Sequence, residues 1–143
     1  MILQSIKNIF ILFMNKVIDY NIYKAILLIG LQRGYTKELI EQEVVLDELK
    51  KLQDMLIKTE GIYLSANCFL SQIVLSGQRE PHLNLHFINY PKFPLTLETF
   101  KSSVETVAAS LMNRFEQNRI VIQFHDSNVM LEKGDDIDPK IIR

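Results

Sequence analysis

The sequence predicts an α+β fold, because a strand–helix–strand pattern occurs twice along the chain. In each copy, two apolar runs of strand length flank a stretch with helical periodicity. The segments are 26–31, 38–58 and 62–69 in the first copy, and 82–88, 96–115 and 119–126 in the second. Equivalent strands are separated by nearly the same number of residues. This regular spacing indicates duplicated βαβ units.

Length and composition place the chain among ordinary globular proteins. Its 143 residues fit one domain, and the hydrophobic and charged fractions are 48% and 23%. The net charge is −1, from 16 basic and 17 acidic residues, so no basic surplus is available to bind phosphates. We therefore expect no nucleic-acid partner. The single cysteine, Cys68, cannot form an internal disulfide and is predicted to be an inert, buried thiol.

Residues 1–23 form a separate amphipathic extension. Apolar side chains recur at steps of three and four residues, which predicts a helix: Ile2, Ile6, Ile9, Phe13 and Val17. The apolar run is too short to span a membrane, and no signal-peptide cleavage site follows it. We expect the helix to pack against the domain; an interfacial membrane helix or a targeting segment is the alternative. The predicted location is cytoplasmic, or secreted without a signal peptide.

Two signals mark the ends of the predicted helices. Gly61 is expected to end the first helix, because glycine readily adopts the left-handed conformation of a helix C-terminus. Thr96 or Thr99 is expected to cap the second.

Beyond the domain, residues 135–143 are polar and acidic, and their carboxylate spacing fits no calcium motif. We expect them to form a solvated tail.

The histidines offer weak candidates for metal or catalytic sites. His82 and His86 are four residues apart and would share one face of a strand, but no third ligand is in register with them. His125 precedes Asp126, yet no serine or cysteine nucleophile is linked to the pair. We therefore predict no metal, no cofactor and no catalytic residue from these patterns.

Three segments resemble macrophage migration inhibitory factor and the tautomerase superfamily. Lys58–Ser65 is similar to that family's lysine-containing turn and second strand, and Ser76–Pro81 to its turn ending in Glu-Pro. Arg119–Asp126 is similar to its penultimate strand. The resemblance covers roughly 26–134. It implies a domain at 24–134 with two helices on a four-stranded mixed sheet, an extra N-terminal helix, and a homotrimer.

The resemblance also implies a chemistry that this chain lacks. Family members catalyse keto–enol tautomerisation with a free N-terminal proline as the base. The matching position here is Leu27, inside the chain, and no proline lies near it. We therefore expect tautomerase activity to be absent or weak, and the function to be binding or cytokine-like. The alternatives are an active keto–enol tautomerase on phenylpyruvate-like substrates, or an α+β adaptor protein.

The same resemblance supplies three candidate substrate-binding residues. Lys58 matches the family lysine that meets a substrate carboxylate, Gln123 matches a pocket asparagine, and Tyr90 falls near a pocket position. The implied ligand is a small aromatic acid, or a protein receptor. The residues alone allow a simpler interpretation: Lys58 is a solvated charge favoured by the helix dipole, and Gln123 lies on the outer face of a strand.

Overall fold

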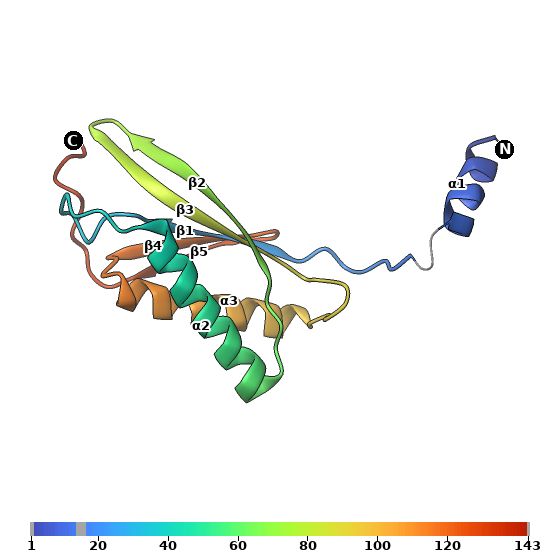
Figure 1. Ribbon diagram of the computed structural model, residues 1–143. Helices are drawn as coiled ribbons and strands as arrows, with labels where there is room; N and C mark the ends of the chain where they lie inside the picture. Colours follow the sequence, from blue (N-terminus) through green and yellow to red (C-terminus); the bar gives the residue numbers. More distant parts are fainter. Residues whose placement is uncertain (1, 14–16, 143) are drawn as a thin grey trace.

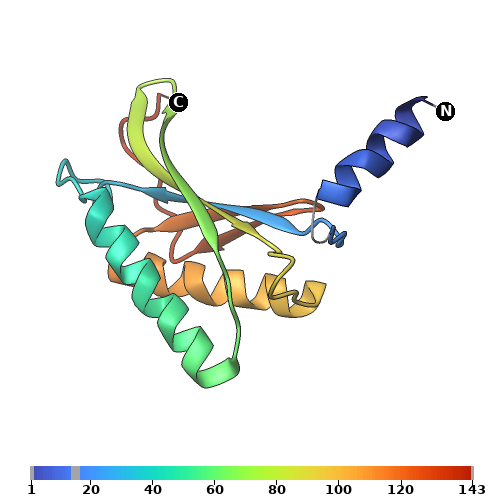
Figure 2. The same cartoon turned by 45° about the vertical axis from the view of Figure 1, so that its right-hand side comes forward.

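A computed structural model describes residues 2–13 and 17–142 of the chain. It contains one sheet, with two helices on one of its faces and a third helix near the N-terminus (Figure 1). The elements are α1 (Ile2–Phe13), β1 (Lys24–Gly30), α2 (Gln42–Glu60), β2 (Ala66–Leu75), β3 (Gln78–Ile88), α3 (Leu97–Arg114), β4 (Arg119–Phe124) and β5 (Asn128–Glu132). Figure 2 confirms that α2 and α3 cover the same side of the sheet.

The sheet has five strands in the order β2-β3-β1-β4-β5, and every neighbouring pair is antiparallel. Strand β1 lies at its centre, where Leu27 pairs with Leu85 of β3 and with Ile122 of β4. The two strand–helix–strand units therefore interleave, and a strand of the other unit separates the two strands of each one. The expected tautomerase-like fold with a four-stranded mixed sheet is wrong. Strand β1 of the first unit forms backbone hydrogen bonds with both strands of the second unit, β3 and β4. The two strands of one unit therefore cannot be neighbours in the sheet.

The core lies between the sheet and its two helices. Alternate residues of β1, β3 and β4 point toward the helices, and Leu27, Leu85 and Ile122 are completely buried there. Each helix contributes one apolar stripe at helical spacing. The buried residues of these stripes include Val45, Leu49, Leu52 and Leu56 from α2, and Phe100, Val104, Val107 and Leu111 from α3.

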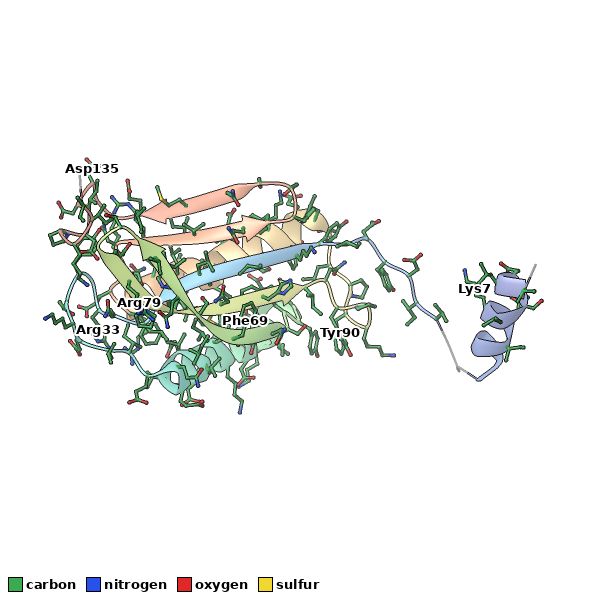
Figure 3. All side chains as sticks on the ribbon, turned by 90° about the horizontal axis from the view of Figure 1, so that it is seen from above. Lys7, Arg33, Phe69, Arg79, Tyr90 and Asp135 are labelled. Carbon is green, nitrogen blue, oxygen red and sulfur yellow. The ribbon has the colours of Figure 1, made fainter. Side chains whose placement is uncertain are left out.

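The opposite face of the sheet, which we call the open face, is not covered by any helix of the described residues. Residues that alternate with the core positions lie on it, among them Leu28 of β1 and His82 and His86 of β3. Apolar side chains are exposed here as well: Phe69 of β2, labelled in Figure 3, is 44% exposed. Met130 of β5 is 53% exposed. The open face is thus a mixed apolar and polar surface.

The local signals read from the sequence at the helix ends are confirmed. Gly61 adopts φ 66°, and its N–H donates to the Ile57 carbonyl oxygen at 3.0 Å, which ends α2. The Thr96 side chain accepts a hydrogen bond from the Thr99 N–H at 3.2 Å, which caps α3.

Cys68 is a free, half-buried cysteine, and burial raises the pKa of its thiol, as expected for an unreactive side chain.

Helix α1 forms as predicted but does not pack as predicted. Ile2, Leu3, Ile6 and Ile9 are between 46% and 83% exposed, and Figure 1 shows α1 apart from the sheet. The side chain of Phe13 lies outside the described residues. Across 2–13 and 17–142, no helix combines the length and the hydrophobicity needed to cross a lipid bilayer. The apolar face of α1 therefore has no partner among the described residues.

Candidate functional site

A cavity of about 390 Å³ opens at one end of the open face. Strands β1 to β4 supply most of its walls, with Gln78, Glu80 and His82 of β3 projecting into it. Another part of the wall is the segment 134–142, which follows β5 and which we call the C-terminal strap. Ile137, Asp138 and Ile141 of this strap line the cavity. Its volume is in the range of small-molecule sites.

Glu80 is the half-buried carboxylate of this cavity. Its Oε2 accepts a hydrogen bond from Gln78 Nε2 at 3.1 Å. Burial raises the pKa of Glu80 above its ordinary value, and the nearby Asp138 carboxylate raises it further, whereas Lys140 and the Gln78 hydrogen bond lower it. A carboxylate in these surroundings is stabilised by an incoming cation, because the cation offsets both lost hydration and like-charge repulsion.

Gly30 makes room for the Glu80 side chain. A Cβ atom at this position of β1 would lie 2.5 Å from Glu80 Oε1 and 2.8 Å from Gln117 Oε1. Gln117 is itself fixed, because its Oε1 accepts from the Gly30 N–H at 3.1 Å and its Nε2 donates to the Gln32 carbonyl oxygen at 3.0 Å. Close contact with glycine backbone therefore sets the position of the Glu80 carboxylate.

The C-terminal strap is held by three side chains, Tyr35, Asn118 and Arg119. The Tyr35 hydroxyl donates to the Asp136 carbonyl oxygen at 2.7 Å, and Arg119 Nη1 donates to the same oxygen at 2.6 Å. Asn118 Nδ2 donates to that oxygen at 3.1 Å and to the Gly134 carbonyl oxygen at 3.3 Å. These bonds fix the backbone of the segment against the domain, although Asp135 and Asp136 keep the exposed side chains expected of a solvated tail.

The anchored strap delivers Asp138 to the cavity. Asp138 is only 5% exposed, and its Oδ2 accepts from Gln78 Nε2 at 3.3 Å. The Glu80 and Asp138 carboxylates thus share one amide nitrogen. Lys140 Nζ lies 3.9 Å from Asp138 Oδ2, so the ammonium group of Lys140 stands beside this carboxylate.

His82 adds a neutral ring to the cavity wall. Burial lowers the pKa of His82, so the imidazole is uncharged at neutral pH, and its Nδ1 lies 3.3 Å from the Glu80 carbonyl oxygen. His86 Nε2 is buried without a hydrogen-bond partner among the described residues. Within the same part of the chain, no group of three His, Cys, Asp or Glu side chains is arranged to hold a metal ion.

The three residues expected to bind substrate do not meet in this cavity. Lys58 is exposed at the end of α2, on the helix side of the sheet. Gln123 is exposed on the open face, because the flanking Ile122 and Phe124 point into the core. Tyr90 is 46% exposed in the loop after β3, and Figure 3 shows it at the end of the sheet away from Asp135.

The comparisons with known proteins give a fold and no sequence family. No family model and no curated protein matches the sequence. The structure is similar to that of a phage SAM lyase in the apo state, with a TM-score of 0.63 and 19% identity over 78% of this chain and 89% of that one. It is also similar to a phage SAM lyase in complex with S-methyl-5'-thioadenosine, with a TM-score of 0.62 and 18% identity over 84% of this chain and 96% of that one.

These similarities correct the expected identity. The chain shares its fold with the phage SAM lyases, and the resemblance to macrophage migration inhibitory factor and the tautomerase superfamily is wrong. The predicted binding or cytokine-like function rested on that resemblance and is withdrawn with it. The active keto–enol tautomerase is withdrawn for the same reason. The α+β adaptor, the alternative for an accidental resemblance, is not proposed again, because the structural similarity points to the SAM lyases.

Proposed function

We propose that this protein is a lyase that cleaves S-adenosylmethionine and releases S-methyl-5'-thioadenosine. The observation that carries the proposal is the fold shared with phage SAM lyases, one of them complexed with S-methyl-5'-thioadenosine, over 78% and 84% of this chain. A shared fold does not by itself assign a function, so the chemistry of the cavity must also fit the reaction.

The charges of the cavity suit this substrate. S-adenosylmethionine carries a sulfonium, an ammonium and a carboxylate, and its net charge is +1. Cleavage breaks the bond between the sulfonium sulfur and the γ-carbon of the methionine part, and the bonding electron pair stays on sulfur. The carboxylate oxygen of the same substrate forms a new bond to the γ-carbon. Neutral S-methyl-5'-thioadenosine therefore leaves, and the four-carbon amino-acid fragment, closed to a lactone, keeps the positive charge on its ammonium group. Arg119 also lines the cavity but is paired with Glu132, so the Glu80 and Asp138 carboxylates favour the cationic substrate over the uncharged product.

We assign Glu80 to the sulfonium. The carboxylate is partly desolvated, and electrostatic attraction is stronger there than in water. The sulfonium would place a positive charge beside the Glu80 carboxylate. Cleavage removes this charge from sulfur, so the attraction ends when the product has formed and release of S-methyl-5'-thioadenosine is eased.

The proposal is tested by incubating the purified protein with S-adenosylmethionine and separating the products by liquid chromatography. We expect S-methyl-5'-thioadenosine to accumulate as fast as S-adenosylmethionine disappears, and faster than in a sample without protein. If the substrate disappears no faster than in that sample, the proposed function is wrong.

Gly30→Ala is expected to reduce S-adenosylmethionine cleavage by about tenfold to a hundredfold, because its new methyl group would displace the Glu80 carboxylate. The matched control is Gly134→Ala, whose Cβ would meet only Asn118 Oδ1, at an ordinary 3.7 Å. Steady-state rates of both variants check the prediction. Equal activity in the two variants would contradict the assigned position of Glu80.

We also propose that the chain assembles as a homotrimer. Strands β2 and β5 are the two edges of the sheet, and unpaired edges are natural sites of association. The exposed Phe69 and Met130 lie on the adjoining open face. Light scattering should give about three times the chain mass of 16.7 kDa. A mass of one chain at micromolar concentration would contradict the assembly.

A further inference from the structure

We infer that Asp138 and Lys140 of the C-terminal strap bind the amino-acid end of the substrate, with Asp138 facing its ammonium and Lys140 its carboxylate. The inference rests on the proposed cleavage of S-adenosylmethionine, and it assigns the specificity of that site to residues after the last strand. The strap would then distinguish ligands that carry an amino acid from those that do not.

The first support is the burial of Asp138 in the wall of the cavity. Asp138 is 5% exposed, and the neighbouring Asp135 and Asp136 of the same strap are exposed. Burying a carboxylate is costly unless it is compensated. Here the compensation comes from the Lys140 N–H, which donates to Oδ1 at 2.9 Å, and from Gln78 Nε2 at 3.3 Å. These polar groups thus compensate the burial of the Asp138 carboxylate at the cavity.

The second support is the number of contacts that fix the strap on both sides of Asp138. Tyr35, Asn118 and Arg119 hold the carbonyl oxygens of residues 134 and 136 before it. After it, the Lys140 carbonyl oxygen packs against Gly77 in the turn between β2 and β3, where a Cβ atom would collide with it. The strap is therefore a fixed wall, and the position of Asp138 is set before any ligand arrives.

The third support is that the two charges of the strap match those of an amino acid. Lys140 Nζ lies 3.9 Å from Asp138 Oδ2, which is a loose ion pair, and the Lys140 side chain is 36% exposed. A zwitterion carries an ammonium and a carboxylate close together, so it can pair with both groups at once. Glu80, on β3, would then face the sulfonium.

The test compares three ligands that share the thioadenosine part and differ in the charged groups that they carry. S-adenosylmethionine has the amino acid and the sulfonium, S-adenosylhomocysteine has the amino acid alone, and S-methyl-5'-thioadenosine has neither. Calorimetric dissociation constants are measured for S-adenosylhomocysteine and S-methyl-5'-thioadenosine, and KM for S-adenosylmethionine. The variants are Asp138→Asn and Lys140→Ala, with Asp136→Asn as the matched control, since its exposed carboxylate lies on the same strap.

We expect Asp138→Asn to weaken the binding of S-adenosylhomocysteine by about tenfold. The KM of S-adenosylmethionine should rise by about the same factor. S-methyl-5'-thioadenosine should bind unchanged, and Asp136→Asn should leave all three constants unchanged. If the binding of S-methyl-5'-thioadenosine were weakened equally, Asp138 would have a merely structural role and the inference would be overturned. Unaltered or undetectable binding of S-adenosylhomocysteine would also overturn it. The binding data are independent of turnover, so a wild-type protein that binds these ligands without cleaving S-adenosylmethionine would contradict only the proposed function.

Discussion

Glu80→Gln is expected to lower kcat/KM for S-adenosylmethionine by about tenfold to a hundredfold, because the positively charged substrate loses a charged partner in the cavity. Glutamine keeps the size of the side chain and can still meet Gln78, so the charge is the main property that changes. The matched control is Glu60→Gln at the exposed end of α2, which should retain wild-type activity. Steady-state kinetics on the three proteins checks the prediction, and full activity of Glu80→Gln would rule out the role assigned to Glu80.

The same substitution should stabilise the folded protein at neutral pH. The folded-state pKa of Glu80 is raised, so the folded protein holds this proton more tightly than the unfolded chain. The stability of the wild type therefore falls as the pH rises from the unfolded pKa through the folded one. Glutamine removes this loss, so the variant should have a higher Tm than the wild type at pH 7, with the difference shrinking below about pH 4. A lower Tm at pH 7 would contradict the unfavourable burial of this charge.

Phe100→Ala is expected to lower the free energy of unfolding by about 3–5 kcal/mol. Phe100 is completely buried on α3, and its ring centroid lies 6.1 Å from that of Tyr23, so truncation leaves a cavity between helix and sheet. Phe93→Ala, at a position 42% exposed, should cost only about 1 kcal/mol, through its lost stacking with Tyr63. Urea unfolding of both variants measures the difference.

A loss of this size is a large part of the stability of a small domain, so Phe100→Ala is accompanied by a milder change. Phe100→Leu keeps an apolar side chain and should lose less. Similar losses for Phe100→Ala and Phe93→Ala would contradict the placement of the core between α3 and the sheet.

The helices could be read from the sequence, because their evidence is local. Apolar residues at helical spacing gave α2 and α3 to within a few residues, and Gly61 and Thr96 marked an end of each. Strand β5 was missed, although Val129 and Leu131 occupy alternate positions, on either side of the exposed Met130, and pack against the core. Alternation over so short a run is a weak signal beside the polar residues that follow it.

The order of the strands could not be read in the same way. Alternation shows that a segment is a strand, but it does not show its neighbours, and the insertion of β1 between β3 and β4 depends on contacts distant in sequence. The short motifs of the tautomerase resemblance, such as a lysine near a helix end followed by an apolar strand, recur in many α+β proteins. They therefore matched without the topology that gives them meaning.

The candidate site was hidden for a related reason. Glu80 and His82 are two residues apart on β3 and therefore share the open face. A polar position there could have been noticed from the sequence. Its partner Asp138 lies on a strap 60 residues beyond Gln78, the residue that joins them. Only the folded chain brings the two carboxylates together, whereas Lys58, Tyr90 and Gln123 are left on separate surfaces.

The most direct test of the proposed lyase is a proton NMR time course of S-adenosylmethionine with the wild-type protein, Glu80→Gln and a sample without protein. The signal of the sulfonium methyl group should decline in the wild-type sample while the thioether methyl signal of S-methyl-5'-thioadenosine grows at the same rate. The Glu80→Gln sample should stay close to the protein-free one. A wild-type sample whose sulfonium methyl signal declines no faster than in the protein-free sample would contradict the account.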